Sequence, residues 1–478
     1  MQQSKLILLL KSLSKKELKE FQAFTASEFF NKNETLIVLL KNISEYQGHF
    51  DSPKLERETF FQKHYPNEVF EDQKFRYMQS DLTKLLEEFL AYNQYSKNEF
   101  GKKYFLLESL HQRNHDKYFL QELDSIQAIN DKSPFRDAEY YFNQHKISEL
   151  SYQYTSEKRN RAFDTSLQEV IDNLEITYLA KGFRYYCEMI NRRNILSVEY
   201  NLSFFDEMVK YLENASFDFV PVILIYRLIH KALTDPENKP NYYQLLSSLR
   251  EHSKLFSQTE QRGMYVFAQN YCIKRINQGD SNALKDIFEL YQLMVDNELI
   301  FEGNYVSQPD FKNIVTTGLR LGEVEWVNGF IEEFREKLNP EFSENAYTYS
   351  MAWIHFTKKE YDKALRMLLR VEFNDVYYHL DSKSLLMKVY YEMNEFDAFL
   401  SLVDAFRIYL RRNKFISEFQ KETYSNFIQV INKLMKLKMR NQPITLAIHE
   451  DICATKPAAD LHWLISKSEE LARLAKII

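Results

Sequence analysis

The chain carries the stretch HFTKKEYDKAL at residues 355–365 and a related stretch, YYEMNEFDAFL, at residues 390–400. The two lie 35 residues apart, and both read as an apolar segment, a short polar turn, an aromatic residue and a second helical segment. A register kept at about 35 residues is typical of stacked helix hairpins, in which each repeat supplies two helices. A single hairpin cannot bury both of its faces, so we expect neighbouring hairpins to pack against one another.

A third, more distant copy extends this register toward the N-terminus. Trp326 lies 35 residues before Tyr361, which in turn lies 35 residues before Phe396. The same spacing relates two further sets of positions: Leu321 with Phe356 and Tyr391, and Gly329 with Ala364 and Phe399. In each copy we expect the aromatic residue to fall just inside the second helix and to pack back on the first.

The segment AWIHFTKKEYDKAL, residues 352–365, resembles the turn between the two helices of a tetratricopeptide repeat (TPR). Ala352 matches the small residue of that repeat's first helix, Tyr361 the aromatic residue after the turn, and Ala364 the small residue of the second helix. The resemblance, which covers residues 310–412, implies a TPR-like α-solenoid. In such a solenoid the first helices of the hairpins line a concave face that can hold a peptide or a helix of a partner protein.

Several features depart from the TPR pattern. Met387 and Phe399 replace the small residues in the copy that follows. Pro340 lies near the position of the usual closing proline but not at it, and the glycine of the turn is missing from the two better copies. Farther upstream, the apolar spacing of residues 265–277 and 283–295 predicts a further, degenerate helix pair.

The composition agrees with a chain made of helices. Only 9 Gly and 10 Pro occur in 478 residues, whereas β-rich folds need many turn residues and doubly wound α/β folds need glycine at their strand-to-helix turns. We therefore predict an all-α fold, divided into an N-terminal helical bundle at 1–98, irregular helix pairs at 99–257, a TPR-like α-solenoid at 258–414 and C-terminal capping helices at 415–478. Aromatic residues, 15% of the chain, are spread over every predicted helix, where they either wedge the hairpins together or form a stacking surface.

The N-terminal segment contains strong helix signals. Ser14 and Glu17 have the spacing of a capping box, and Asn33 is placed to cap the helix that follows it. A short helix is expected from Pro53 to Phe61, and a long amphipathic helix over residues 75–90.

Three short strings make this segment similar to the opening of an uncharacterised conserved bacterial protein family. They are FNKNE at 30–34, FDSPKL at 50–55 and DQKFRYMQSD at 72–81. The resemblance implies a bacterial cytoplasmic protein and brings no mechanism with it.

The C-terminal segment is expected to cap the row of hairpins. A long helix is predicted from 415 to 439, followed by a loop that contains Pro443 and Pro457. A last amphipathic helix carries leucines at helical spacing, namely Leu461, Leu464, Leu471 and Leu474. Terminal repeats of a solenoid need a cap with a polar outer face, which this helix could supply.

Charge, cysteines and hydropathy indicate the compartment. The net charge is −6, which disfavours broad affinity for nucleic acid. The three cysteines, Cys187, Cys272 and Cys453, lie far apart in sequence, as in proteins of a reducing compartment. No run of 18 apolar residues occurs, and the short apolar run at 6–10 is followed at once by a lysine. We therefore expect a cytoplasmic protein without membrane insertion.

Motifs for catalysis or cofactor binding are absent from the sequence. It contains no phosphate loop, no Gly-x-Gly, no Gly-x-Ser-x-Gly, no Cys-x-x-Cys and no His-Glu-x-x-His. The nearest acid–base or metal-binding set is His449, Glu450 and Asp451, which we place in an exposed polar loop. The acid pairs at 87–88 and 332–333 are typical of solvated helix faces. We predict no enzyme activity, cofactor, metal or small-molecule substrate, although a site scattered through the sequence stays open.

The concave face of the expected solenoid carries the leading functional hypothesis. Under the 35-residue register, two neighbouring first helices place six groove residues on that face: Tyr349, Trp353, Phe356, Ser384, Lys388 and Tyr391. Aromatic anchors beside a lysine would suit an extended peptide or a helix of a protein partner. The alternative is that these aromatic side chains only fill the space between hairpins. The leading prediction is therefore a non-enzymatic protein-interaction scaffold or adaptor.

A basic segment at 405–440 supports a second hypothesis. Nine Lys and Arg residues are opposed there by only two acids. The predicted basic patch comprises Arg407, Arg411, Arg412, Lys433, Lys436, Lys438 and Arg440. It either contacts nucleic acid or another polyanion, as a regulator would, or is a solvated face paired with acids elsewhere.

The N-terminal bundle invites a DNA-binding interpretation through Lys74 and Arg76. Residues 1–98 carry 14 basic and 14 acidic residues, however. A net charge of zero supplies little of the attraction to phosphate on which such modules depend. We therefore disfavour this interpretation.

Overall fold

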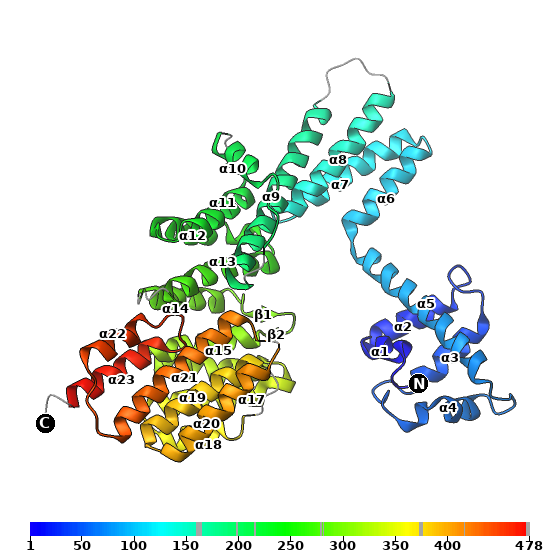
Figure 1. Ribbon diagram of the computed structural model, residues 1–478. Helices are drawn as coiled ribbons and strands as arrows, with labels where there is room; N and C mark the ends of the chain where they lie inside the picture. Colours follow the sequence, from blue (N-terminus) through cyan, green and yellow to red (C-terminus); the bar gives the residue numbers. More distant parts are fainter. Residues whose placement is uncertain are drawn as a thin grey trace. The chain divides into compact units, whose positions relative to one another are not determined.

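The computed structural model describes residues 1–158, 165–196, 199–214, 217–277, 280, 282–371, 376–414 and 416–474. Over these residues the chain forms 23 α-helices, three short 3-10 turns and one hairpin of two-residue strands, β1 (Phe301–Glu302) and β2 (Tyr305–Val306). The predicted all-α class is confirmed (Figure 1). The chain divides into two compact units, the first comprising 1–132 with 146–170 and the second 133–145 with 171–478.

The first unit opens with a bundle of five helices. They are α1 (Lys5–Lys11), α2 (Lys15–Ala26), α3 (Glu34–Ser44), α4 (Arg57–His64) and α5 (Asp72–Lys97). The first four helices all pack on the long helix α5. The core of this bundle includes the fully buried side chains of Phe21, Leu39, Phe60 and Leu82.

Local sequence signals account for the ends of these helices. The predicted capping box is confirmed, because the side chains of Ser14 and Glu17 each accept a hydrogen bond from the other residue's backbone N–H. Asn33 caps α3 as predicted. The single helix expected from Pro53 to Phe61 is instead a 3-10 turn, Pro53–Leu55, followed by α4, because Glu56 adopts an extended conformation and caps α4.

A second, smaller core lies in the same unit. Helices α6 (Glu99–Gln112) and α7 (Asp116–Lys132) form a hairpin, and α8 (Ala138–Glu157) adds to its core. The buried residues of this core are Leu107, Phe119, Ile126, Ile147 and Leu150. Helices α8 and α9 (Ser166–Leu196) contribute residues to both units.

The second unit holds the remaining helices. In chain order they are α10 (Phe205–Asn214), α11 (Pro221–Thr234), α12 (Lys239–His252), α13 (Gln258–Asn277), α14 (Asn282–Asp296), α15 (Gln308–Leu321), α16 (Val324–Phe334), α17 (Pro340–Thr357), α18 (Tyr361–Leu368), α19 (Val376–Met393), α20 (Phe396–Arg412), α21 (Glu418–Met439), α22 (Leu446–Ala454) and α23 (Leu461–Leu474). Consecutive helices pack as pairs: α11 with α12, α13 with α14, α15 with α16, α17 with α18, α19 with α20 and α22 with α23. The first helices of three neighbouring pairs also touch, since α15 packs on α17 and α17 on α19. Helix α19 packs in addition on α21, which follows the last of these pairs.

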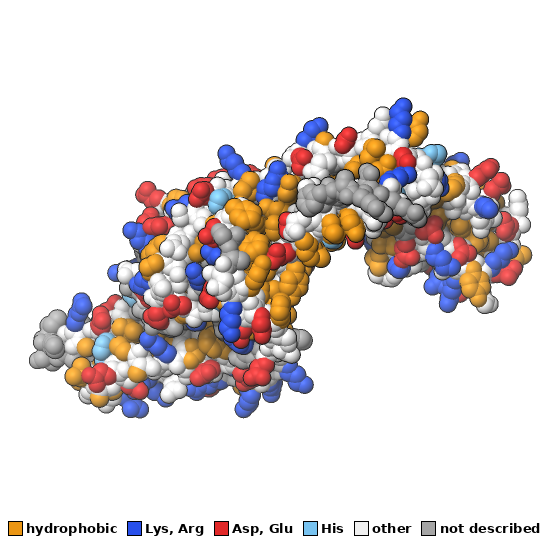
Figure 2. Space-filling model, turned by 90° about the horizontal axis from the view of Figure 1, so that it is seen from above, with side chains coloured by type: hydrophobic (Ala, Val, Ile, Leu, Met, Phe, Trp, Pro, Cys, Tyr) orange, Lys and Arg blue, Asp and Glu red, His pale blue; other side chains and the backbone are white. Residues whose placement is uncertain are grey.

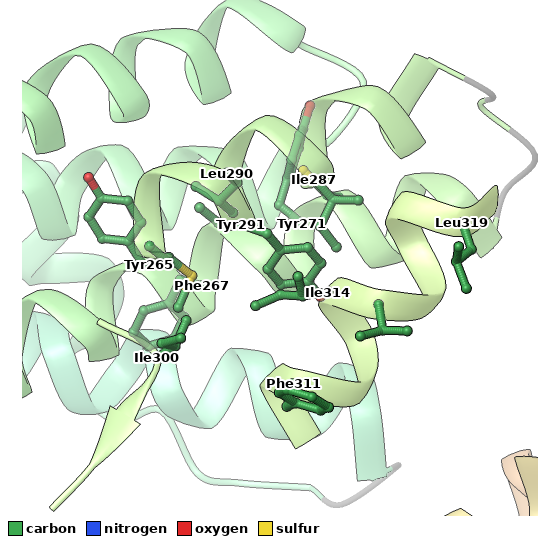
Figure 3. Close-up of a cluster of buried hydrophobic side chains, with 14 of the residues drawn as sticks. Tyr265, Phe267, Tyr271, Ile287, Leu290, Tyr291, Ile300, Phe311, Ile314 and Leu319 are labelled. Carbon is green, nitrogen blue, oxygen red and sulfur yellow. The ribbon is translucent and has the colours of Figure 1, made fainter. Parts of the chain in front are cut away.

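One continuous core fills the second unit, and its largest fully buried side chains are aromatic. Figure 3 shows part of it, where side chains of α13, α14 and α15 lie together between the helices. Tyr271, Tyr291 and Ile314 are among them, and each is at most 2% exposed. Large rings in the helix interfaces agree with the interpretation that aromatic residues wedge the helix pairs together.

Three of the helix pairs are joined by the same kind of tight turn. Gly322, Lys359 and Asn394 have positive φ angles of 86°, 60° and 60°, and one glutamate separates each from the second helix. Glycine and asparagine suit the left-handed region, whereas a lysine there is less common. The turn therefore keeps its geometry in the copies that lack glycine.

The first copy of the repeat differs from the predicted register. Its second helix, α16, begins at Val324, whereas α18 and α20 begin at Tyr361 and Phe396. These starts are 37 and 35 residues apart, so Val324 is the structural counterpart of Tyr361, and the pairing with Trp326 is wrong by two residues. The expected packing of the aromatic residue on the first helix is confirmed for Tyr361, whose ring lies 5.7 Å from that of Phe356. The ring of Trp326 instead lies 5.0 Å from that of Phe288 on α14.

A helix also occupies the segment that was predicted as a loop between Pro443 and Pro457. Helix α22 begins after Thr445, whose side chain accepts a hydrogen bond from the N–H of Ile448. It has nine residues and a single fully buried side chain, Ile452. A helix this short with one buried side chain does not produce the regular spacing of apolar residues from which helices are predicted.

Candidate functional site

All six predicted groove residues are buried in the second unit. Helix α17 carries Tyr349, Trp353 and Phe356, and helix α19 carries Ser384, Lys388 and Tyr391. The structure brings the six together because α17 packs on α19. The chain's own C-terminal segment contacts Ser384, Lys388 and Tyr391, so the interface observed there is intramolecular. Whether these residues also contact a partner stays a prediction.

The ammonium group of Lys388 is the centre of this site. Only 1% of its side chain is exposed, and its Nζ lies 2.6 Å from Oδ2 of Asp460. The same Nζ lies 4.1 Å from the ring centre of Trp353 and 5.4 Å from that of Phe356. The ring of Trp463 is 5.9 Å away. A carboxylate and three aromatic rings thus surround the charge in place of water. We call Trp353, Phe356 and Lys388 the Lys388 socket.

Asp460 lies in the short connection between α22 and α23. Its φ of 47° is in the left-handed region, which Asp and Asn enter more readily than most residues that have a side chain. Helix α21 fixes this connection in two places. The side-chain amide of Asn426 donates to the carbonyl of Pro457 at 2.8 Å, and the N–H of Ala459 donates to the carbonyl of Thr423 at 3.2 Å.

Helix α23 continues the contact with α19. The ring of Trp463 stands nearly perpendicular to that of Tyr391, with ring centres 5.4 Å apart. Lys467 Nζ lies 2.8 Å from Oε1 of Glu392. Asp460, Trp463 and Lys467 are three and four residues apart, so they lie on one side of the helix start. We call residues 457–467 the C-terminal strap.

A second polar link joins helices α15, α19 and α21. The carboxylate of Asp381 on α19 accepts hydrogen bonds from Lys312 on α15 and from the hydroxyl of Tyr424 on α21. On α17, Nε1 of Trp353 donates to the hydroxyl of Tyr349 at 2.7 Å. Polar contacts therefore join α15, α19 and α21, and a separate hydrogen bond links two aromatic side chains of α17.

Burial sets the proton equilibria of these groups. It lowers the pKa of the Lys388 ammonium, and the Asp460 carboxylate only partly opposes this. Burial alone would raise the pKa of Asp460, but the positive charges of Lys388 and Arg320 outweigh it, so that pKa lies below its usual value. Burial, with the charge of Asp381, raises the pKa of Tyr349 well above its usual value. At neutral pH the strap therefore presents a carboxylate to a lysine, beside a neutral tyrosine.

The seven residues of the predicted basic patch do not form one surface. Three lie at the C-terminal end of α20: Arg407, Arg411 and Arg412. Four lie at or just past the C-terminal end of α21: Lys433, Lys436, Lys438 and Arg440. The two helices pack together through a short connection and so run antiparallel, which puts these two groups at opposite ends of the pair. The 18 residues from Glu418 to Lys436 alone span about 27 Å of helix.

Two members of the patch have partners within the fold. Lys433 Nζ lies 2.8 Å from Oδ2 of Asp451, and Lys438 Nζ donates to the carbonyl of Tyr391 at 2.8 Å. On the face shown in Figure 2, basic and acidic side chains are interspersed. These observations do not favour a polyanion site, and the hypothesis of a nucleic-acid regulator stays a prediction.

The other residues weighed in the sequence lie at the surface. Lys74 and Arg76 are exposed on α5, where Arg76 pairs with Asp72. The acid pairs at 87–88 and 332–333 are exposed as well. His449, Glu450 and Asp451 lie on α22. Within the described ranges, no group of three or more His, Cys, Asp or Glu side chains is arranged to hold a metal ion.

Asp460 and Trp463 are site residues that the sequence interpretation missed. Asp460 directly precedes the last amphipathic helix, and Trp463 lies in its first turn. The sequence interpretation of this helix considered only its leucines, such as Leu464. The only available signal was the Asp-x-x-Trp spacing. It occurs once, so it belongs to no repeat, and it does not indicate which residues the two side chains contact. Asp381 gave no signal at all.

Comparison with protein-family models, with curated proteins and with solved structures finds no match to this chain. Among the residues that the structure describes, no helix has both the length and the apolar character needed to cross a bilayer.

Proposed function

We propose that this chain is a non-enzymatic protein-interaction scaffold, built as an α-solenoid of TPR-like helix hairpins, whose first helices hold a polypeptide segment of a partner. Two features support the architecture. First helices of neighbouring pairs pack on one another from α15 to α19, and three pairs share one turn geometry. Both are properties of stacked helix hairpins.

The observation that carries the proposal is the Lys388 socket with the strap seated in it. A buried ammonium pairs with Asp460 and lies among the rings of Trp353 and Trp463. Charge-assisted hydrogen bonds are stronger than neutral ones, and buried aromatic anchors are enriched among the few residues that dominate binding energy. The partner's segment would accordingly present an acidic side chain followed three residues later by an aromatic one.

The strap and such a partner would compete for the same socket. An intramolecular segment acts at a high effective concentration, so a partner binds only weakly while the strap is seated. Loosening the strap should therefore raise the affinity for a peptide in trans, provided that the socket itself is intact.

The test uses the full chain and a labelled peptide, KPAADLHWLISKSEE, which copies residues 456–470. The double variant Asp460→Asn, Trp463→Ala loosens the strap and leaves the socket unchanged. We expect it to bind the peptide at least tenfold more tightly than the unaltered chain does, as measured by fluorescence anisotropy.

Two controls distinguish specific recognition from non-specific binding. Adding Trp353→Ala and Lys388→Glu to the double variant should abolish binding, and so should a peptide that lacks the acidic and Trp side chains. If the double variant retains its helical circular dichroism but does not bind the peptide, the scaffold proposal is wrong in its choice of site.

A further inference from the structure

Helices α22 and α23 bring together a thiol, an imidazole and a hydroxyl. Sγ of Cys453 lies 3.6 Å from Nε2 of His449, which is one helical turn earlier on α22. Nδ1 of His449 lies 2.7 Å from Oγ of Ser468 on α23. Ser468 is fully buried, whereas Cys453 and His449 are partly exposed. Of the three, Ser468 alone is closed to solvent.

The hydrogen bonds of Ser468 favour one tautomer of His449. A serine hydroxyl has one hydrogen, and the carbonyl of Ile465, 2.7 Å from Oγ of Ser468, can only accept it. When Ser468 donates to that carbonyl, its oxygen accepts a hydrogen from Nδ1 of His449. Nε2 is left with its lone pair directed at the thiol of Cys453, which makes His449 a base oriented toward that thiol.

The other two cysteines have no such arrangement. Cys187 and Cys272 are buried, and their thiols donate to the carbonyl of Tyr226 and to the hydroxyl of Tyr242. Burial raises the pKa of Cys187, and it raises the pKa of Cys272 to about 12. Both are inert structural thiols and serve as internal references for Cys453.

We propose that Cys453 is a modification site that forms a mixed disulfide with a low-molecular-weight disulfide, with His449 as the base and Ser468 as a positioning residue. Nε2 takes the proton of the thiol while Sγ attacks one sulfur of the disulfide R–S–S–R. The Sγ–S bond forms, the S–S bond breaks, and the leaving thiolate takes the proton from the imidazolium. The products are Cys453–S–S–R and R–SH: Cys453 is oxidised, and the other sulfur is reduced.

The surroundings select this reaction over acyl transfer. Attack on a disulfide creates no oxyanion, so a nucleophile and a base are sufficient. Cys453 is one residue from the C-terminal end of α22, where the helix dipole disfavours an anion. Removal of the proton therefore depends on His449. Glu450, which is exposed on the same helix, disfavours anionic reagents, so an uncharged disulfide is the matched probe.

The experiment treats the full chain with 2-hydroxyethyl disulfide at pH 7 and follows the adduct on each cysteine by peptide mass spectrometry. An ordinary thiol is a few per cent ionised at this pH, so an oriented base can raise the rate by up to about thirtyfold. We expect modification of Cys453 alone, and a rate about tenfold lower in His449→Gln. Ser468→Ala should lower the rate several-fold, because the imidazole loses its orientation.

A second measurement separates base catalysis from altered packing. At pH 10 a thiolate forms without a base, so the unaltered chain and His449→Gln should react at similar rates. A variant that had opened the fold would instead expose Cys187 and Cys272, and these would be modified as well. Equal rates in His449→Gln and the unaltered chain at pH 7 would overturn the proposal, as would modification of Cys187 as fast as that of Cys453.

Discussion

Nζ of Lys388 lies 2.6 Å from Oδ2 of Asp460, a residue 72 positions farther along the chain. The lysine is 1% exposed and the aspartate side chain 21% exposed, so the pair is mostly shielded from water. A shielded charge that keeps its partner is tolerated, whereas one that loses its partner is costly. This contact therefore joins the C-terminal strap to α19 more strongly than an exposed ion pair would.

Replacing Asp460 with Asn tests that join. Asn also adopts the left-handed backbone conformation of this position, so Asp460→Asn removes the negative charge and little else. We expect a loss of about 3 kcal/mol in the free energy of opening of the strap, because the Lys388 ammonium remains buried without its counter-ion. Hydrogen–deuterium exchange of residues 457–474 measures this opening directly.

The double variant Asp460→Asn, Lys388→Met is the matched control. Without the lysine there is no unpaired charge to bury, so we expect protection of the strap to recover by more than half. An Asp460→Asn variant whose strap exchanges at the unaltered rate would show that the pair contributes nothing. Glu333→Gln, which removes an exposed ion pair with Lys337, should change exchange by less than a factor of three.

Two glycines of one helix pair should respond to alanine in opposite ways. A Cβ at Gly318 on α15 would overlap Cγ2 of Val327 and lie 2.9 Å from Cε2 of Phe288, both of which are buried. A Cβ at Gly329 on α16 would meet no atom within 4 Å. We expect Gly318→Ala to destabilise the second unit by about 1–2 kcal/mol and Gly329→Ala to stabilise it by up to about 1 kcal/mol. Urea unfolding followed by circular dichroism measures both, and shifts of the same sign would contradict the packing of α15 on α14 and α16.

The capping box of α2 supports a prediction in the first unit. The hydroxyl of Ser14 accepts from the N–H of Glu17, and the carboxylate of Glu17 accepts from the N–H of Ser14. Ser14→Ala should lower the free energy of opening of α2 by about 1 kcal/mol, since an N–H of the first turn loses its partner. Glu17→Gln, which can still accept, should lower it by less. Amide exchange over residues 15–26 gives both values; an effect of Glu17→Gln larger than that of Ser14→Ala would point to charge and not to capping.

Local signals predicted most of the fold because their causes are local. The capping box of Ser14, the cap at Asn33 and the aromatic residue after the turn at Tyr361 depend on neighbours within a few positions, and all three were found. The register of the first repeat was wrong because sequence spacing assumes equal repeats, whereas the turn at Gly322 is displaced by two residues relative to that spacing.

The candidate site could be predicted only in part, because its decisive contact is between distant segments. Helical spacing placed Lys388 on the same face as Trp353, and the structure does bring the two together. Spacing cannot show that a segment 72 residues away covers this face, and a lysine is ordinarily assumed to lie at the surface. The contact of Asp460 with Lys388 could not be predicted from the sequence, since the position of a counter-ion beside a buried charge depends on tertiary packing.

The free energy of unfolding of the second unit should depend on pH through the titration of Asp280. The guanidinium of Arg275 donates to its carboxylate at 2.6 Å, and Lys239 lies 3.0 Å away. These hydrogen bonds, that of Arg275 first, lower the pKa of Asp280 to about 2. In the unfolded chain the pKa of an aspartate is about 3.9, so the unfolded state binds the proton first as the pH falls. The stabilisation is therefore complete above about pH 5 and is lost between about pH 4 and pH 2.

The difference in free energy of unfolding between the unaltered chain and Asp280→Asn isolates this contribution. Because 24% of the Asp280 side chain is exposed, solvent screening reduces the full linkage value, and we expect about 1–2 kcal/mol at pH 6. That difference should shrink steadily from pH 4 downward in urea titrations. Asp296→Asn, which removes an exposed charge on α14, controls for net charge and should show no such trend. A difference that stays constant down to pH 2.5, or that grows as the pH falls, would mean that the carboxylate of Asp280 does not stabilise the fold through Arg275.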